Sequence, residues 1–407
     1  MRFVVDSQIP FAVEALSAHG EVVALPGSAI APEALVGADA LWVRSTVRVD
    51  AELLAACDLR FVGTVTSGVD HLDIASLERR GIAWAAAPGS NAGAVQRWWA
   101  AALTAQALCD GVPLARRRVG VVGVGHVGRR VAAFARAFGG EVLLCDPPRA
   151  RAEGAAGFLP LPELLSRVDL LTLHVPLTRG GSDPTWHLIG GRELATLGNG
   201  SLLVNCARGS VVDSAALLAE RGRIVALLDV FEGEPEVATE SVTAAALATP
   251  HLAGSSLDGK IAASRTVYEA TCAALHLTPA WPSAAVLAPP EPHRLEIQTN
   301  GLSDEAIVVA ALAPFHSLAA DDAALRRIAG LPPSERGAAF ERHRTASTPH
   351  REPIGVEVAL APARPAAAAA LAALGMIPES DTNAAQSVER SSPPDRPSDV
   401  ASRGRRS

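Results

Sequence analysis

From the N-terminus to about residue 250, short apolar runs alternate with longer segments of helical pattern. Glycine, proline or polar residues bound each run, so the runs predict buried parallel strands joined by crossover helices. A first series of strands is expected at residues 3–5, 21–25, 40–43, 61–65 and 82–86, and a second at 118–122, 141–145, 170–175, 201–205 and 224–230. The second series predicts a doubly wound, Rossmann-type sheet, and the first a smaller parallel α/β unit.

Long helices are expected at residues 92–110, 127–138 and 257–275, and Gly139 and Gly140 end the second of them. A proline-rich linker at 279–292 then leads into a small α+β module that ends near residue 377. Its strands are expected at 294–298 and 355–360, and its helices at 304–312, 323–329 and 366–374. Beyond residue 377 the chain is rich in Ser, Pro, Asp and Arg, which predicts a disordered tail at 378–407.

Composition excludes several classes of protein. The 407 residues are 49% hydrophobic and 19% charged, which is typical of a globular enzyme. The formal net charge of −7 argues against a nucleic-acid partner. The N-terminus does not resemble a signal peptide, and no apolar run is long enough to span a membrane. The five cysteines are scattered without a pairing pattern, so we expect free thiols and a cytoplasmic protein.

A glycine motif follows the first strand of the second series. Gly123, Gly125 and Gly128 fit G-x-G-x-x-G, with His126 and Val127 between them, and Asp146 ends the next strand at about the expected distance. The pattern predicts a dinucleotide whose pyrophosphate lies on the helix N-terminus and whose ribose binds Asp146. The alternative is a structural glycine turn followed by an ordinary loop aspartate. Because Asp146 would repel a 2′-phosphate unless Arg149 or Arg151 approached, NAD is favoured over NADP.

Three segments at the ends of later strands carry reactive side chains, at residues 205–209, 229–235 and 249–254. Ligands of open α/β sheets bind at the carboxyl ends of strands, so all three segments can face one crevice. Oxidation of a 2-hydroxy acid requires a base for the hydroxyl proton, for which we select His251. Glu234 would orient that histidine, and Arg208 would bind the substrate carboxylate.

Each of these residues also has a structural interpretation. An arginine in a loop is often a solvated charge, and a single histidine is often structural. Glu232 and Glu236 could replace Glu234.

Together these motifs resemble the D-isomer-specific 2-hydroxy acid dehydrogenases. Within that family the likeness is greatest to the branch that oxidises 4-phospho-D-erythronate, and it covers about residues 1–377. The likeness to the family depends on residues 123–128, 146, 206–209, 229–235 and 251. The likeness to this branch depends on residues 41–45, 61–71, 87–92, 144–149, 232–236 and 256–260. The last of these ranges holds the single lysine of the chain, Lys260.

The resemblance implies a function and a domain division. It implies NAD-dependent oxidation of 4-phospho-D-erythronate in pyridoxine biosynthesis, and a homodimer held by the C-terminal module. A flavodoxin-like substrate (lid) domain would comprise residues 1–91 and 256–285, and an NAD-binding Rossmann domain 92–255. A dimerisation domain would comprise 286–377.

The resemblance also assigns site residues, and no metal is expected among them. It implies catalytic roles for Arg208, Glu234 and His251. Cofactor contacts would come from the glycine motif, Asp146, Val175, Cys206, Ala207, Arg208, Asp229 and Gly254. Substrate contacts would come from Ser45, Thr66 and Ser255.

Three positions depart from the family pattern. Ser255 stands where a tyrosine is common, Gln96 and Arg97 where an acidic residue is usual, and Val175 where a hydroxyl side chain is frequent. Arg44 is a candidate for the substrate phosphate, with other arginines left open. The competing hypotheses are another member of the family, such as a phosphoglycerate dehydrogenase, and a non-catalytic NAD-binding scaffold.

Overall fold

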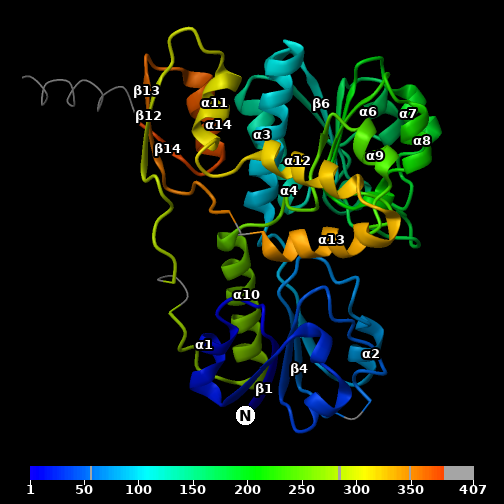
Figure 1. The fold of residues 1–407 in the computed structure, drawn as a ribbon, viewed down its shortest axis with the longest axis vertical. Helices are drawn as coiled ribbons and strands as arrows, with labels where there is room; N and C mark the ends of the chain where they lie inside the picture. Colours follow the sequence, from blue (N-terminus) through cyan, green and yellow to red (C-terminus); the bar gives the residue numbers. More distant parts are fainter. Residues whose placement is uncertain (56, 283–285, 348–349, 380–407) are drawn as a thin grey trace, which may run out of the picture.

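The computed structural model describes residues 1–55, 57–282, 286–347 and 350–379, and contains three parallel sheets (Figure 1). The first sheet has the order β2-β1-β3-β4-β5, formed by β1 (Arg2–Asp6), β2 (Glu21–Leu25), β3 (Ala40–Val43), β4 (Phe61–Thr64) and β5 (Ala83–Ala85). Its outer helices include α1 (Ala12–Leu16) and α2 (Ile74–Arg79). The order is that of flavodoxin-like sheets.

Both faces of the central strands β1, β3 and β4 are buried, which explains their nearly continuous apolar runs. Along β3, Leu41 and Val43 point into one core cluster, whereas Ala40 and Trp42 point into another on the opposite face. Helix α10 (Leu257–Leu275) covers the second face, although it lies far away in the sequence. The chain therefore returns to the first sheet after completing the second.

The second sheet has the order β11-β10-β9-β8-β6-β7. Its strands are β6 (Arg118–Val122), β7 (Glu141–Cys145), β8 (Leu170–Leu173), β9 (Leu202–Asn205), β10 (Val225–Leu228) and β11 (Leu247–Ala248). The chain passes from β6 outward to β7 and then crosses to β8 on the other side of β6. The switch point between β6 and β8 is where an open α/β sheet binds its ligand.

Helices cover both faces of the second sheet. They include α3 (Ala92–Asp110), α4 (His126–Ala137), α5 (Pro147–Glu153), α6 (Leu161–Leu165), α7 (Gly191–Thr196), α8 (Ser214–Ala219) and α9 (Thr239–Ala244). Trp98, Trp99 and Leu103 of α3 are buried completely against the sheet. The Rossmann-type fold predicted for this part of the chain is confirmed.

The third sheet consists of β12 (Arg294–Gln298), β13 (Glu357–Ala361) and β14 (Ile377–Pro378), which pair in parallel. Its helices α11 (Asp304–Leu312) and α14 (Pro365–Ala373) pack against α3 and α4. Ile307 and Leu371 consequently belong to the same core cluster as Trp99. The small module thus shares its core with the second sheet.

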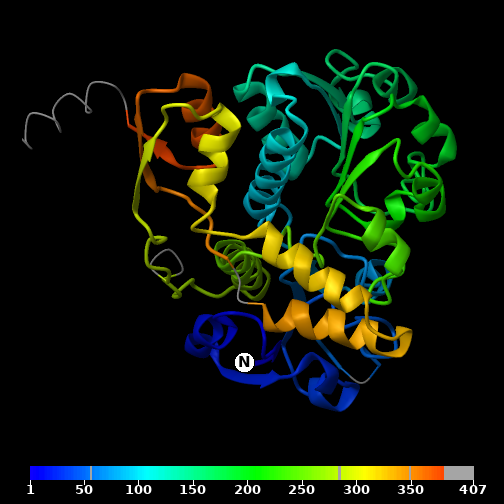
Figure 2. The ribbon, with the colours of Figure 1, turned by 45° about the horizontal axis from the view of Figure 1, so that its top comes forward.

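Two further helices lie in the chain between α11 and β13 of this small module. Helices α12 (Leu318–Ala329) and α13 (Pro333–Ala346) lie along the second sheet on the side of the first sheet (Figures 1 and 2). Leu325 and Phe340 are buried there with Val242 of α9. Helix α13 was not predicted from the sequence, because alanines and charged residues surround its one large apolar side chain, Phe340.

Most expected elements lie where the sequence places them, and the bounds of α3, α10 and α11 agree to the residue. The division into domains stays a prediction. The expectation of a disordered tail is wrong for residues 378–379, because Pro378 pairs with Val358 and Glu379 N donates a hydrogen bond to Val358 O at 2.9 Å. Residues 380–407 of the expected tail lie outside the described residues. Within the described ranges, no helix is both long and apolar enough to cross a membrane.

Candidate active site

Arg208 extends from the end of β9 towards the first sheet. The Asn205 side chain fixes the loop between them: its Oδ1 accepts a hydrogen bond from Ala207 N at 3.1 Å, and its Nδ2 donates to Arg208 O at 3.0 Å. Arg208 Nη2 then lies 3.5 Å from Asp70 Oδ2, in the loop after β4. A Cβ atom at Gly68 would lie 2.5 Å from the same nitrogen. The guanidinium therefore bridges the space between the two sheets.

His251 and Glu234 form a hydrogen-bonded pair beyond the ends of β10 and β11. His251 Nδ1 lies 2.7 Å from Glu234 Oε2, while Glu234 Oε1 accepts a hydrogen bond from Phe231 N at 2.7 Å. A carboxylate at Nδ1 favours the tautomer with the proton on Nδ1, which leaves the Nε2 lone pair available. Glu232 binds His187 instead, and Glu236 packs against Gly337 of α13. Glu234 is thus the carboxylate paired with the predicted base.

Asp229 stabilises the segment that carries His251. Its carboxylate accepts hydrogen bonds from Thr249 Oγ1 at 2.6 Å and from the amides of Leu252 and Ala253, each at 2.9 Å. Burial raises the pKa of Asp229 to about 6. The His251 backbone has a φ of 56°, in the left-handed region that is unfavourable for residues other than glycine. Asp229 thus supports a strained histidine, and a cofactor contact by its side chain stays a prediction.

Trp98 extends this support into α3, because its Nε1 donates a hydrogen bond to Thr249 Oγ1 at 3.0 Å. Asn205 and Thr249 lie within the segments selected from the sequence but had no role assigned, and Trp98 was not selected. The sequence offers one sign of the supporting role of Thr249, which is its position two residues before His251.

The glycine motif has the geometry of a pyrophosphate cradle. Cβ atoms at Gly123 and Gly128 would collide with the backbone of His174 and of Gly123, so both glycines are required by packing. Gly125 is different, because a Cβ atom there would meet open space, and it precedes α4 without a side-chain cap. The amides of this helix N-terminus thus face a space that a phosphate group can occupy. The residues present therefore fit a dinucleotide.

Asp146 lies beside this cradle. Its Oδ2 accepts a hydrogen bond from Val124 N at 2.7 Å, and its Oδ1 caps α5 through Arg149 N at 3.1 Å. Arg149 pairs with Glu153 and donates to Val124 O at 2.7 Å, while Arg151 pairs with Asp183. Both arginines that could hold a 2′-phosphate pair with carboxylates, and the Asp146 carboxylate would repel such a phosphate, which favours NAD.

Other predicted cofactor residues surround the switch point. Val175 follows β8 and packs against Gly123, while Cys206 and Ala207 are buried after β9. Burial raises the pKa of the Cys206 thiol far above its ordinary value. All five cysteines are free thiols, as expected. Gly254 lies against the Asn91 side-chain amide, and His126 packs on Gly89.

The predicted substrate residues lie on the side of the first sheet. Ser45 is exposed after β3, and Thr66 Oγ1 donates a hydrogen bond to Gly68 O at 2.7 Å after β4. Ser255 is half-buried between the His251 segment and α10. Ser67, which the sequence analysis did not select, donates to Asn91 Oδ1 at 2.8 Å. The three predicted residues thus follow different elements that converge between the first two sheets.

The departure at Arg97 has a structural explanation. Arg97 is buried, and its Nη1 donates hydrogen bonds to Phe315 O at 3.4 Å and Arg351 O at 3.1 Å. Burial lowers the pKa of Arg97, whereas the carboxylates of Glu352, Asp258 and Asp321 oppose that change. The C-terminal segments thus supply acidic groups around a cation on α3.

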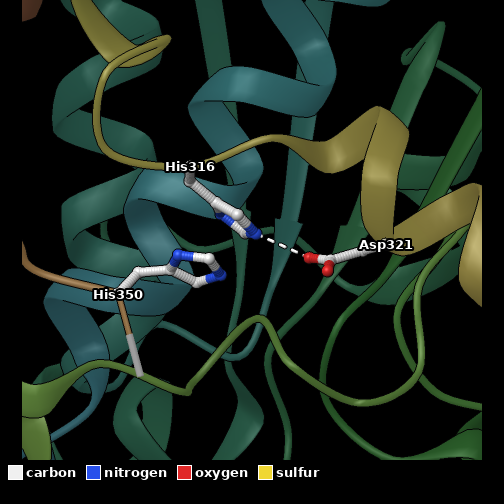
Figure 3. A group of neighbouring side chains, drawn as sticks. All are labelled: His316, Asp321 and His350. Atoms are coloured by element: carbon white, nitrogen blue, oxygen red, sulfur yellow. Dashed lines mark hydrogen bonds and ion pairs between the residues drawn. The ribbon is translucent and has the colours of Figure 1, made fainter. Parts of the chain in front are cut away.

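Next to Arg97, the side chains of His316, Asp321 and His350 converge (Figure 3). His316 Nε2 lies 2.6 Å from Asp321 Oδ2, and the His316 and His350 rings lie 3.9 Å apart between centroids. Burial, with His316 and Arg97 nearby, lowers the pKa of His350 to about 4. The positive charge of the neighbouring Arg97 guanidinium disfavours a divalent cation at this cluster. That the protein binds no metal remains a prediction.

Comparisons with known proteins agree with this geometry. Residues 87–253 match the family model described as "D-isomer specific 2-hydroxyacid dehydrogenase, NAD binding domain". The chain is 43% identical over 382 residues to an erythronate-4-phosphate dehydrogenase of Azotobacter vinelandii, which covers 93% of this chain and 100% of the relative. Another, of Escherichia coli O157:H7, is 41% identical over 335 residues, 82% of this chain and 88% of the relative.

Solved structures show the same fold over about two thirds of the chain. A D-lactate dehydrogenase of Aquifex aeolicus, complexed with NAD and lactic acid, has a TM-score of 0.57 and 25% identity, covering 68% of this chain and 96% of the other. The TT0316 protein of Thermus thermophilus has a TM-score of 0.56 and 28% identity, covering 69% and 98%. The chain therefore belongs to the erythronate-4-phosphate dehydrogenase family, within the D-isomer-specific 2-hydroxyacid dehydrogenases, and residues 87–253 match the NAD-binding domain of that family.

Proposed function

We propose that this protein oxidises 4-phospho-D-erythronate to (R)-3-hydroxy-2-oxo-4-phosphooxybutanoate with NAD, in the biosynthesis of pyridoxine (vitamin B6) and pyridoxal 5′-phosphate. The similarity to relatives of that name covers nearly the whole of both chains. The observation that carries the proposal is the His251–Glu234 pair, which lies beside the predicted cofactor and substrate segments.

His251 acts as the general base. The reaction removes a hydride from C2 and a proton from the C2 hydroxyl, so one NAD⁺ becomes NADH and one proton is released. NAD, held by the residues described below, would supply the hydride acceptor. His251 Nε2 takes the hydroxyl proton, and Glu234 stabilises the resulting imidazolium through its bond at Nδ1.

Arg208 binds the C1 carboxylate and polarises the carbonyl that forms at C2. A guanidinium offers two parallel N–H donors, which match a carboxylate. In the structure Arg208 Nη1 donates a hydrogen bond to Ala207 O at 2.8 Å, and Nη2 lies 3.5 Å from the exposed Asp70, a surface ion pair of the weak kind. A substrate carboxylate can therefore replace Asp70 at little cost. Ser45, Thr66 and Ser255 complete the substrate contacts.

Several parts of the chain would hold NAD. The amides at the start of α4 would bind the pyrophosphate, with His126 and Val127 beside it, and Asp146 would bind the adenosine ribose. Further contacts would come from Val175, Cys206, Ala207, Arg208, Asp229 and Gly254.

The assembly and location follow from the same assignment. We propose a cytoplasmic homodimer in which residues 286–377 form the interface, with the substrate domain at 1–91 and 256–285. The five free thiols support a reducing compartment. Light scattering on the purified protein should give twice the 42.0 kDa chain mass, and a monomer would contradict this part of the proposal.

NADH oxidation by the purified protein tests the activity. The protein is offered (R)-3-hydroxy-2-oxo-4-phosphooxybutanoate beside 3-phosphohydroxypyruvate, because reduction is the favourable direction near neutral pH. We expect a higher kcat/KM for the four-carbon compound. Preference for the three-carbon compound would instead indicate a phosphoglycerate dehydrogenase, and no turnover of either would favour an NAD-binding scaffold.

A further inference from the structure

Two cations lie at the carboxyl edge of the first sheet. Arg44 follows β3, and its Nε binds Asp6 Oδ2 at 2.8 Å at the end of the neighbouring strand β1. Asp6 is fully buried, and its Oδ1 accepts a hydrogen bond from Gln8 N at 3.0 Å. The carboxylate thus holds the guanidinium by Nε. Among the residues that the structure describes, neither terminal nitrogen of Arg44 has a hydrogen-bond partner.

Contacts on both sides place Lys260 above the same edge. Gly259 lies against the loop after β5, because a Cβ atom there would be 3.0 Å from Ser90 O. Ser264, one turn further along α10, donates a hydrogen bond to Pro10 O at 2.9 Å in the loop after β1. The Lys260 backbone therefore lies between the loops that follow β1 and β5, over strands β3 and β4, after which Arg44 and Thr66 follow.

The charges at this edge do not balance. Within the described ranges, no carboxylate forms an ion pair with Lys260, so Asp6 is the one acidic partner of the two cations. Lys260 is an exposed residue, and desolvation, followed by the charge of Arg44, lowers the pKa of its ammonium. Lys260 is also the only lysine of the chain. Such a pair is stabilised by an anion that both cations contact.

This edge borders the predicted active site. Ser45 follows Arg44 directly, and Thr66 follows the neighbouring strand β4. Ser67 binds Asn91, which contacts both Gly259 and Gly254. Gly254 itself lies three residues after His251 in the same segment. An anionic group bound by Arg44 and Lys260 would therefore belong to a molecule that also reaches His251.

We propose that Arg44 and Lys260 together bind the phosphate of a phosphomonoester substrate, with the Ser45 hydroxyl as a further donor. The inference deepens the proposed function, because it names the groups that recognise the 4-phosphate. The terminal nitrogens of Arg44 supply two directed N–H donors, and the Lys260 ammonium supplies a mobile charge. Asp6 is the positioning residue that orients Arg44.

The test compares a phosphorylated substrate with an unphosphorylated one. In Lys260→Met, kcat/KM for (R)-3-hydroxy-2-oxo-4-phosphooxybutanoate should fall about ten- to a hundredfold, chiefly through KM, since a charge-assisted contact is lost. The kcat/KM for the same compound without its phosphate should change less than about twofold. Arg48→Gln, which removes an exposed cation from the same loop, should change neither value. Equal losses on both substrates, or no loss on either, would overturn the assignment.

Binding of inorganic phosphate separates this inference from the proposed function. Calorimetry on the wild-type protein should detect phosphate binding that Lys260→Met weakens about tenfold or more and Arg48→Gln does not. If the protein binds phosphate through Lys260 but shows no turnover, the result would support the phosphate-binding assignment and contradict the proposed substrate. Phosphate binding unaffected by Lys260→Met and by Arg44→Gln would contradict the subsite, whatever the activity. Thermal unfolding of each variant checks that it is folded.

Discussion

Glu234 holds His251 by Nδ1 at 2.7 Å, while its second carboxylate oxygen is fixed by the Phe231 amide. One carboxylate thus connects the loop after β10 to the segment after β11. This arrangement orients the imidazole before any substrate binds, and an acid–base group is effective only when its reacting atom is correctly placed. The loop that carries Glu234 and the segment that carries His251 therefore hold the imidazole in place together.

Replacement of His251 should separate catalysis from cofactor binding. His251→Ala should lower kcat by about 10²–10⁴-fold or more, because it removes the group proposed to take the C2 hydroxyl proton. Glu234→Gln keeps a hydrogen-bond acceptor but loses the charge that stabilises an imidazolium, so its kcat should lie between those of the wild type and His251→Ala. Steady-state kinetics and NADH fluorescence titration measure both properties.

The matched control is His276→Ala, an exposed histidine at the end of α10. It should leave kcat and NADH affinity unchanged. Near-normal turnover by His251→Ala would contradict the proton-transfer role, and loss of NADH binding would show that the substitution disturbs the fold of the site.

The sequence predicts the first two sheets well because their central strands are buried on both faces. Continuous apolar runs such as 40–43 and 170–173 have few alternatives to a central strand, and glycines mark the turns beside them. The glycine motif, Asp146, Arg208, Glu234 and His251 are also visible, because each follows a strand that is easily recognised. Parallel topology then brings those strand ends together.

The supporting contacts are not visible in the same way. Trp98 reaches Thr249 and Arg97 reaches Phe315 O across more than a hundred residues, and nothing local marks either side chain as polar support. Helix α13 lacks an apolar stripe and is fixed by Phe340 against the second sheet. Tertiary packing decides such positions, so local pattern cannot reveal them.

Asp146→Ala should weaken NAD binding. The carboxylate is expected to accept hydrogen bonds from the ribose diol, and loss of such bonds to a charged group costs about 1.5–3 kcal/mol, or roughly ten- to a hundredfold in affinity. The ratio of kcat/KM values for two 2-oxo acid substrates should stay the same, because Asp146 lies by the glycine motif. Calorimetry with NADH measures the affinity.

Because Asp146 also caps α5, Asp213→Ala serves as its control. Asp213 caps α8 through Ala216 N, so this variant loses a comparable helix cap outside the cofactor site. Unchanged NADH affinity in Asp146→Ala would contradict the assignment of Asp146 to the ribose site. An equal loss in both variants would assign the effect to general instability.

Trp98 and Trp99 offer a comparison between neighbouring residues of α3. Each indole donates a hydrogen bond to a buried threonine, Trp98 to Thr249 and Trp99 to Thr172. Phenylalanine at either position leaves a buried hydroxyl without its donor, so each variant should lose about 1–3 kcal/mol of unfolding free energy. Only Trp98→Phe should also lower kcat, because Thr249 supports Asp229 and the His251 segment. Equal effects of both variants on kcat would show that Trp98 only packs in the core and does not support the His251 segment.

The neutral state of His174 in the folded protein should lower stability in mild acid, where the unfolded chain protonates this residue. Burial lowers the pKa of His174 to about 3, from an ordinary value of 6.5. Between these values the unfolded chain binds a proton that the folded chain excludes. This group therefore makes the free energy of unfolding fall as pH decreases from about 6.5 towards 3, by at most about 1.4 kcal/mol per pH unit.

His174→Gln should make that pH dependence shallower. His350, whose pKa is lowered to about 4, acts in the same direction. Asp229, whose pKa is raised to about 6, acts in the opposite direction, because its folded form takes up a proton first. Both remain in the variant, so the difference between variant and wild type isolates His174. Urea unfolding at pH 5 and pH 7.5 measures it, with His276→Gln as the exposed control. Parallel curves for wild type and His174→Gln would show that His174 is protonated equally in the folded and unfolded states.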